Sequence, residues 1–104
     1  MTVIEELSIP EGISGEDGGH ELVRFWVCDG DDHVSLRIGL FDDDEEPAVW
    51  GNVAADIMKH VVNALVQTDP RRDPDVMFAE IERAFAQRLK ETTDFSGQLS
   101  GETH

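Results

Sequence analysis

The sequence predicts a single α+β domain in which an antiparallel β-hairpin packs against two α-helices. Three patterns support this prediction: a β-rich stretch over residues 21–41 with a turn near its centre, and apolar residues at helical spacing over 46–67 and 74–92. The strands precede the helices instead of alternating with them, which is the order of an α+β fold. At 104 residues the chain is long enough for one compact domain, expected over residues 21–93.

Residues 1–20 are expected to lie outside that domain. In the first ten residues the aliphatic side chains follow neither strict alternation nor helical spacing, which indicates an extended arm that ends at Pro10. A third strand formed by this arm at the edge of the hairpin is an open alternative. Residues 11–20 are rich in glycine and acidic residues and are expected to form a mobile loop.

Residues 21–41 give the clearest strand pattern. The segment ELVRFWVC is dense in β-branched and aromatic residues, and HVSLRIGL alternates between apolar and polar residues. The turn between them allows two registers. A type II′ turn centred on Gly30-Asp31 is favoured here, and a type I′ turn centred on Asp29-Gly30 is the alternative.

The favoured register gives the hairpin two different faces. One face holds three apolar cross-strand pairs and is expected to be covered by the first helix: Val23 with Ile38, Phe25 with Leu36, and Val27 with Val34. The other face carries Trp26 and places Arg24 directly opposite Arg37, which is unfavourable unless acidic residues lie nearby. Only the second helix or another molecule is left to cover this second face.

The first helix, residues 46–67, is the element around which the domain is expected to pack. Its apolar residues recur at three- and four-residue spacing and form one broad face: Val49, Trp50, Val53, Ala54, Ile57, Met58, Val61, Val62 and Leu65. Pro47 and the acidic run 42–46 suit a helix N-terminus. Gly51 is either tolerated at a cost of about 1 kcal/mol relative to alanine, or allows another backbone to approach.

The second helix is expected over residues 74–92. Asp69-Pro70 ends the first helix, Asp73 suits the capping position, and Pro74 suits the first helical turn. Apolar residues then recur at helical spacing: Met77, Phe78, Ile81, Ala84, Phe85 and Leu89. Residues 94–104 are expected to form a disordered tail.

The charge of the chain limits its partners. With 8 basic and 23 acidic residues, the formal net charge is -15, so phosphate backbones and anionic lipid surfaces are repelled within a screening length of about 8 Å. No nucleic-acid or membrane partner is therefore expected. A basic protein partner, a cation or simple colloidal solubility each fits the charge, and solubility is the simplest interpretation. The start of the chain lacks the pattern of a signal peptide, and the cysteine content is a single residue, so the cytoplasm is the expected compartment.

The sequence indicates neither a metal site nor a cofactor. The acidic segments that begin at Asp29 and Asp42 have Val34 and Pro47 where a calcium-binding loop needs glycine. The four histidines do not have the spacing of zinc ligands.

Two residue pairs suggest chemistry, each with a simpler interpretation. Asp56 and His60 lie one helical turn apart, as in half of a general-base arrangement, but such pairs are more often local helix contacts worth about 0.2–0.5 kcal/mol. Cys28 and His33 would be cross-strand neighbours in the favoured register, as a cysteine nucleophile requires. A strand cysteine is more often a small apolar residue.

Short motifs across residues 21–66 resemble a small bacterial family, domain of unknown function 5076. These motifs are Arg24 with Trp26 on the first strand, His33–Arg37 on the second, and Trp50-Gly51, Asp56-Ile57 and His60-Val61 on the helix. The resemblance implies a small cytoplasmic bacterial protein with no assigned activity, so it supplies no catalytic residues.

The sequence therefore favours a non-enzymatic, homo-oligomeric interaction module, most simply a homodimer whose interface includes the second hairpin face. The alternative is a small-ligand-binding or weakly catalytic domain that uses Asp56, His60 and the Arg24/Arg37 pair. The candidate ligand or interface residues are Arg24, Trp26, His33, Arg37, Trp50, Asp56 and His60. A ligand site requires a concave pocket with convergent polar groups, whereas an interaction module requires an extended apolar surface.

Overall fold

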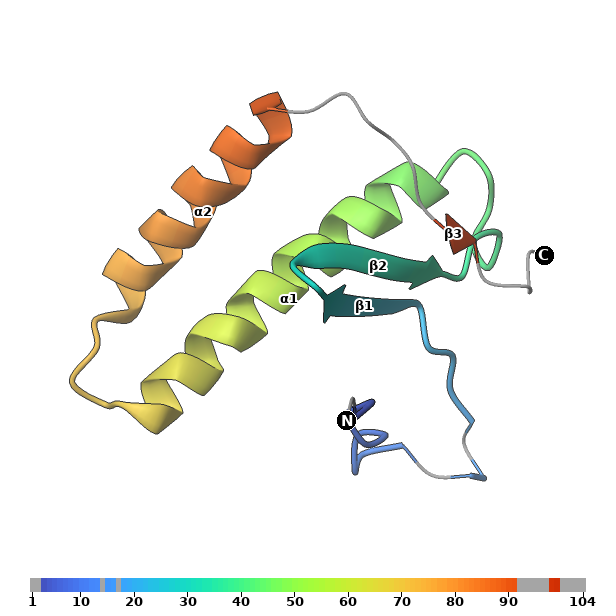
Figure 1. The fold of residues 1–104 in the computed structure, drawn as a ribbon. Helices are drawn as coiled ribbons and strands as arrows, with labels where there is room; N and C mark the ends of the chain where they lie inside the picture. The colour runs from blue at the N-terminus through green and yellow to red at the C-terminus, as the bar shows by residue number, and fades with distance from the viewer. Residues whose placement is uncertain (1–2, 14, 17, 92–97, 100–104) are drawn as a thin grey trace.

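The structure is a computed structural model that describes residues 3–13, 15–16, 18–91 and 98–99 (Figure 1). Its elements are β1 (Val23–Cys28), β2 (Asp31–Leu36), α1 (Glu46–Thr68), α2 (Pro74–Glu91) and β3 (Gln98–Leu99). An antiparallel hairpin followed by two helices confirms the predicted α+β class. Each helix ends within one residue of its predicted limit.

The hairpin turn is of the alternative type, and the favoured register is wrong. Cys28 pairs with Asp31, so Asp29 and Gly30 form a two-residue turn. Their φ angles are 53° and 81°, and positive values at both positions define a type I′ turn. Aspartate tolerates this left-handed backbone better than most residues and glycine has no Cβ to clash, so the Asp-Gly dipeptide accommodates the turn.

The pairing consequently slides by two residues relative to the favoured register. The observed pairs are Val23–Leu36, Arg24–Ser35, Phe25–Val34, Trp26–His33, Val27–Asp32 and Cys28–Asp31. Arg24 therefore does not oppose Arg37, and Cys28 does not oppose His33. Because strand side chains alternate with a period of two, the slide leaves every residue on its predicted face of the hairpin.

A third strand comes from the C-terminal segment and not from the N-terminal arm. Gln98 and Leu99 pair in parallel with Ser35 and Leu36, which gives the sheet order β1-β2-β3. The described part of the arm, residues 3–10, contains no strand. The prediction of a disordered tail is thus wrong for residues 98–99, and the rest of that segment lies outside the described residues.

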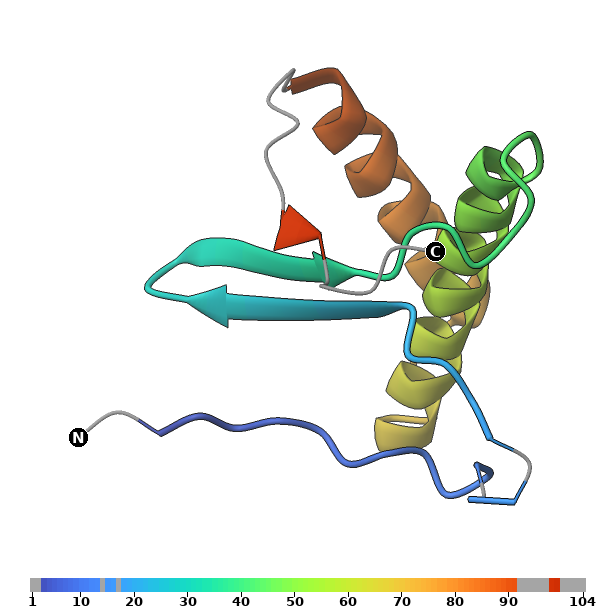
Figure 2. The same ribbon diagram turned by 90° about the vertical axis from the view of Figure 1, so that its right-hand side faces the viewer.

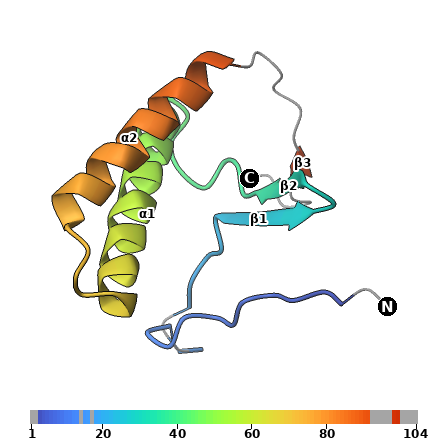
Figure 3. The same ribbon diagram turned by 60° about the vertical axis from the view of Figure 1, so that its left-hand side comes forward.

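The helices form a layer of their own. α1 packs against α2, and in the described part of the chain neither helix packs against β1 or β2. Figures 2 and 3 show the hairpin projecting from the helix pair, with the N-terminal arm extending alongside the hairpin. The expected covering of the first hairpin face by α1 is not observed: Phe25 is 62% exposed and Val27 is 69% exposed.

The hydrophobic core is small. Among the described residues, Val62 is the one buried hydrophobic side chain, at 5% exposure, and Glu46 is the one buried charged side chain. Many large apolar side chains are exposed: Val3, Ile4, Leu7, Ile9, Ile13, Phe25, Val27, Ile57, Val61, Val76, Phe85 and Leu89. Ile57 and Val61 belong to the apolar face predicted for the first helix, so only part of that face is covered within one chain.

Candidate functional site

Arg24, on the second face of β1, binds two carboxylates. Its Nε donates a hydrogen bond to Glu21 Oε1, and its Nη1 donates one to Glu6 Oε2, both over 2.8 Å. The hydrogen bond to the Glu21 side chain, followed by the one to Glu6, raises the pKa of Arg24 above its ordinary value. Through Glu6, the guanidinium also holds the N-terminal arm beside β1.

Arg37 shares the same acidic neighbour without facing Arg24. Its Nε donates a hydrogen bond to the backbone carbonyl of Glu21 over 2.9 Å. The side chain and the carbonyl of Glu21 thus bind two different arginines, which relieves the repulsion expected for a pair of adjacent cations.

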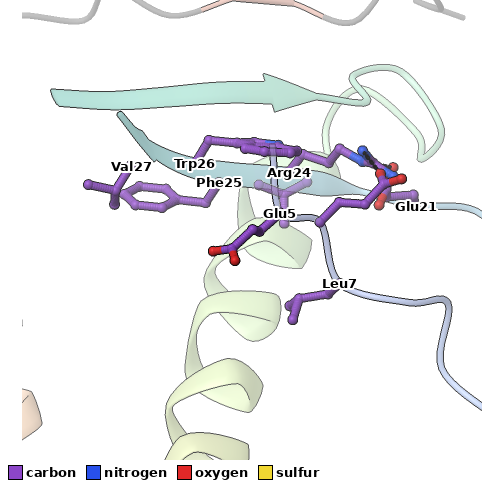
Figure 4. Close-up of a pocket in the computed structure, with 9 residues that line it drawn as sticks. Glu5, Leu7, Glu21, Arg24, Phe25, Trp26 and Val27 are labelled. Atoms are coloured by element: carbon purple, nitrogen blue, oxygen red, sulfur yellow. Dashed lines mark hydrogen bonds and ion pairs between the residues drawn. The ribbon is translucent and has the colours of Figure 1, made fainter. Parts of the chain in front are cut away.

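A hollow of about 270 Å³ lies between the arm and the outer edge of β1 (Figure 4). It is lined by Glu5, Glu6 and Leu7 from the arm, by Glu21, and by Val23, Arg24, Phe25, Trp26 and Val27. Its cation, Arg24, is already bound to two carboxylates. Small-ligand sites usually combine an apolar wall with a few convergent polar groups, and this hollow offers chiefly carboxylates and a strand edge.

A second hollow, of about 480 Å³, lies between α1 and α2. Its lining is mostly apolar: Gly51, Ala54, Ala55 and Met58 from α1, and Glu82, Phe85, Ala86 and Leu89 from α2. A Cβ atom added at Gly51 would meet nothing within 4 Å. Close backbone approach to Gly51 therefore does not occur within the described chain.

The buried carboxylate of Glu46 connects the segment after the hairpin to the first helix. The sequence predicted Glu46 only as part of the acidic run before α1. Both oxygens of Glu46 accept the backbone N–H of Gly39, each over 3.1 Å, and Oε2 also accepts the Trp50 indole N–H over 3.0 Å. Trp50, a candidate ligand residue, is thus bound to its own helix. The contact between Glu46 and Trp50 could have been predicted, because residues four apart on a helix are neighbours. The contact between Glu46 and Gly39 could not, because no local pattern connects these residues.

The remaining candidates are not assembled into one site. Asp56 and His60 are both exposed on α1, and no hydrogen bond joins them in the part of the chain that the structure describes. They lie on a helix that does not pack against the strand that carries Arg24. Cys28 is an exposed free thiol, and His33 is exposed opposite Trp26.

Neither a metal cluster nor a membrane span is found in the described regions. No group of three histidine, cysteine or acidic side chains there is close enough to hold a metal ion. Neither described helix is long and apolar enough to cross a membrane.

Comparisons with known proteins identify a family and a fold. A family model described as domain of unknown function DUF5076 matches residues 6–93. A solved structure named as a candidate pyruvate dehydrogenase from the photosynthetic bacterium Rhodopseudomonas palustrus CGA009 is similar over 100% of both chains, with a TM-score of 0.66 and 22% identity. At that identity the likeness shows the fold alone. A search of curated proteins found no match.

Proposed function

We propose that this chain, which belongs to the DUF5076 family, is a homo-oligomeric interaction module whose hydrophobic core is completed by a second copy. The observation that supports this proposal is the exposure of large apolar side chains on β1, α1 and α2. Phe25 and Val27 on β1, Ile57 on α1 and Leu89 on α2 are all at least 47% exposed. A single chain therefore leaves much of its hydrophobic stabilisation unused.

The dimensions of the chain support the same proposal. Its radius of gyration is 16.1 Å, whereas a compact domain of this length has about 13 Å. Folding must offset a backbone entropy cost of about 1–2 kcal/mol for each ordered residue, chiefly by burying apolar surface. Burying one large apolar side chain contributes about 1.5–3 kcal/mol, so association that covers several such side chains supplies a substantial part of the stability.

Charge opposes association and so restricts where it occurs. Two chains that each carry a net charge of -15 repel one another, and the contact surfaces should therefore be poor in carboxylates. The segment Val23–Cys28 contains no acidic residue, and of the three carboxylates that line the hollow beside it, Glu6 and Glu21 are paired with Arg24. Added salt screens the remaining repulsion, so association should strengthen from low to physiological ionic strength.

The test is the oligomeric state together with its coupling to folding. Sedimentation equilibrium at micromolar concentration is expected to give a dimer. The urea midpoint should rise with protein concentration, because unfolding of such a dimer releases two chains. A monomer whose midpoint does not depend on concentration would refute the proposal.

A cytoplasmic location is part of this proposal. Cys28 is an exposed free thiol, and the reducing cytoplasm preserves such thiols. A small-ligand or catalytic function is not favoured, because Asp56 and His60 lie on an element that does not pack against the strand bearing Arg24.

A further inference from the structure

We infer that two copies join edge to edge through β1, in antiparallel pairing about a two-fold axis at Phe25. This inference rests on the proposed self-association and specifies the surface that performs it. The sheet order β1-β2-β3 leaves β1 with one edge that pairs with no described strand. An unpaired edge presents a row of backbone donors and acceptors that another strand can satisfy.

The hairpin register determines which backbone groups face outward. In a two-residue hairpin the pair flanking the turn exchanges both of its hydrogen bonds, and such pairs then recur at every second residue. Here the flanking pair is Cys28–Asp31, and the Arg37 N–H donates to the Leu22 carbonyl over 2.9 Å in the same series. The even-numbered residues of β1 therefore bond to β2. The N–H and C=O groups of the odd-numbered residues Val23, Phe25 and Val27 point to the open edge.

Antiparallel pairing of two identical strands allows few registers. Outward-facing residues must oppose outward-facing residues, and an axis at Phe25 achieves this over the whole of β1. It sets Val23 against the partner's Val27 and Phe25 against the partner's Phe25. An axis at Arg24 would instead oppose two arginines, and an axis at Trp26 would leave Val23 beyond the paired segment.

The Phe25-centred register gives complementary contacts on both faces of the joined sheets. On the first face, the exposed side chains of Phe25 and Val27 meet those of the partner, which removes the largest uncovered apolar group of the hairpin from water. On the second face, Arg24 lies opposite the partner's Trp26, at the distance of a cross-strand pair. The two-fold axis makes each of these contacts twice.

The existing partners of Arg24 are compatible with this stacking. Its guanidinium donates to Glu21 and Glu6 through N–H groups at its edge, and neither hydrogen bond uses the planar faces on which an aromatic ring stacks. The N-terminal arm borders the same hollow as the open edge without forming a strand (Figure 4). Entry of the partner's strand therefore requires the arm, which Glu6 joins to Arg24 over 2.8 Å, to leave the open edge.

A disulfide cross-link tests the register directly. In a Cys28→Ser background, Phe25→Cys places two thiols across the axis, where Cα atoms of a hydrogen-bonded pair lie about 5.5 Å apart, within the range that a disulfide accepts. Mild oxidation should convert most of the protein to a covalent dimer. The matched control is Val34→Cys, on the same face but on β2, which should remain largely monomeric on a non-reducing gel.

A proline substitution tests the edge without a cross-link. Val27→Pro removes an outward-facing N–H, which an edge strand tolerates, and the two-fold axis removes that hydrogen bond twice. The dissociation constant of the dimer should rise by about 10- to 100-fold, with far-ultraviolet circular dichroism retained. Trp26→Pro is the matched control, because it removes an inward N–H and should disrupt the hairpin itself.

The outcomes separate the two proposals. A dimer by sedimentation in which Phe25→Cys cross-links no faster than Val34→Cys would overturn the β1 pairing and leave the interaction module standing. If β1 instead pairs with the arm of its own chain, Phe25→Cys would likewise cross-link no faster than Val34→Cys. If the protein is also a monomer by sedimentation, both the β1 pairing and the interaction module are refuted. Selective cross-linking at Phe25 together with weakened association of Val27→Pro supports the inference.

Discussion

Replacing Glu46 with alanine should loosen the connection between the hairpin and the helix pair. Glu46 is 9% exposed, and its carboxylate accepts hydrogen bonds from the Gly39 backbone N–H, after β2, and from the Trp50 indole N–H on α1. No other packing joins α1 to β1 or β2 in the described residues. The perturbation therefore acts on a polar contact that joins the loop after β2 to α1.

The magnitude follows from the two donors. A hydrogen bond to a charged group contributes about 1.5–3 kcal/mol, and a half-buried donor left without its acceptor is partly rehydrated by water. We therefore expect Glu46→Ala to lower the free energy of unfolding by about 2–4 kcal/mol. Glu46→Gln keeps one acceptor oxygen but loses the charge, and should cost about 1–2 kcal/mol.

The control is Glu45→Ala, at the exposed neighbouring position. Glu45 occupies the N-cap of α1 but makes no side-chain capping hydrogen bond, so its replacement should change stability by less than about 0.5 kcal/mol. All variants are compared by urea unfolding at one fixed protein concentration, with Trp50 fluorescence followed in a Trp26→Phe background. Equal losses for Glu46→Ala and Glu45→Ala would show that the carboxylate does not hold the junction.

Three further predictions concern single elements. Gly30→Ala should destabilise by about 1–2 kcal/mol, since the φ of Gly30 is 81° and a Cβ disfavours that backbone; unchanged thermal stability would contradict the type I′ turn. Val62→Ala should lower the free energy of unfolding by about 1–3 kcal/mol, because it leaves a cavity in the core. Replacing the exposed Lys59 with alanine should change it by less than about 0.5 kcal/mol, and equal effects would show that α1 buries a different face. The side-chain hydrogen bond from Arg71, followed by its backbone N–H, lowers the pKa of Asp69 below the ordinary value of 3.8, so the stability that this carboxylate contributes is present above pH 3.8 and is lost as the pH falls through the lowered pKa. The difference in stability between wild type and Asp69→Asn should therefore shrink below pH 3.8 in acid titrations, and a difference that stays constant there would contradict the contact.

The two helices could be predicted from sequence because their limits are set locally. The start of α2 is determined within three residues: Asp73 Oδ1 accepts the Asp75 N–H over 2.9 Å, and Pro74 occupies the first helical position. The end of α1 follows in the same way from Asp69 and Pro70. The apolar periodicity between these limits can be recognised without knowing the rest of the fold.

The hairpin register could not be predicted in the same way, because two turn types were compatible with the sequence. Both turns use Gly30, and the choice rests on whether its neighbour takes up the left-handed backbone conformation. Asp29 does so, at φ 53°. The predicted faces nevertheless survived, because a slide of two residues preserves the alternation of side chains.

The contacts that link distant segments could not be read from the sequence. Glu46 reaches Gly39 only because the loop after β2 folds back over the first turn of α1. The pairing of Leu99 with Leu36 likewise joins residues that no local pattern connects. For the candidate site, the prediction that Arg24 lies directly opposite Arg37 was wrong, because Arg24 pairs with Ser35, and the contacts of both arginines with Glu21 could not be read from the sequence.

The apolar pattern of α1 shows why a core predicted from sequence can belong to more than one chain. Helical periodicity identifies side chains that are to be buried but does not specify what buries them. Val62 is buried within the chain, whereas Val61, its neighbour in the predicted face, is 42% exposed. The same division separates the half-buried Val23 from the exposed Phe25 and Val27 on β1. If pairing of β1 with a second copy covers Phe25 and Val27, the exposed Val61 requires a further surface of that copy, because α1 does not pack against β1 within the described chain.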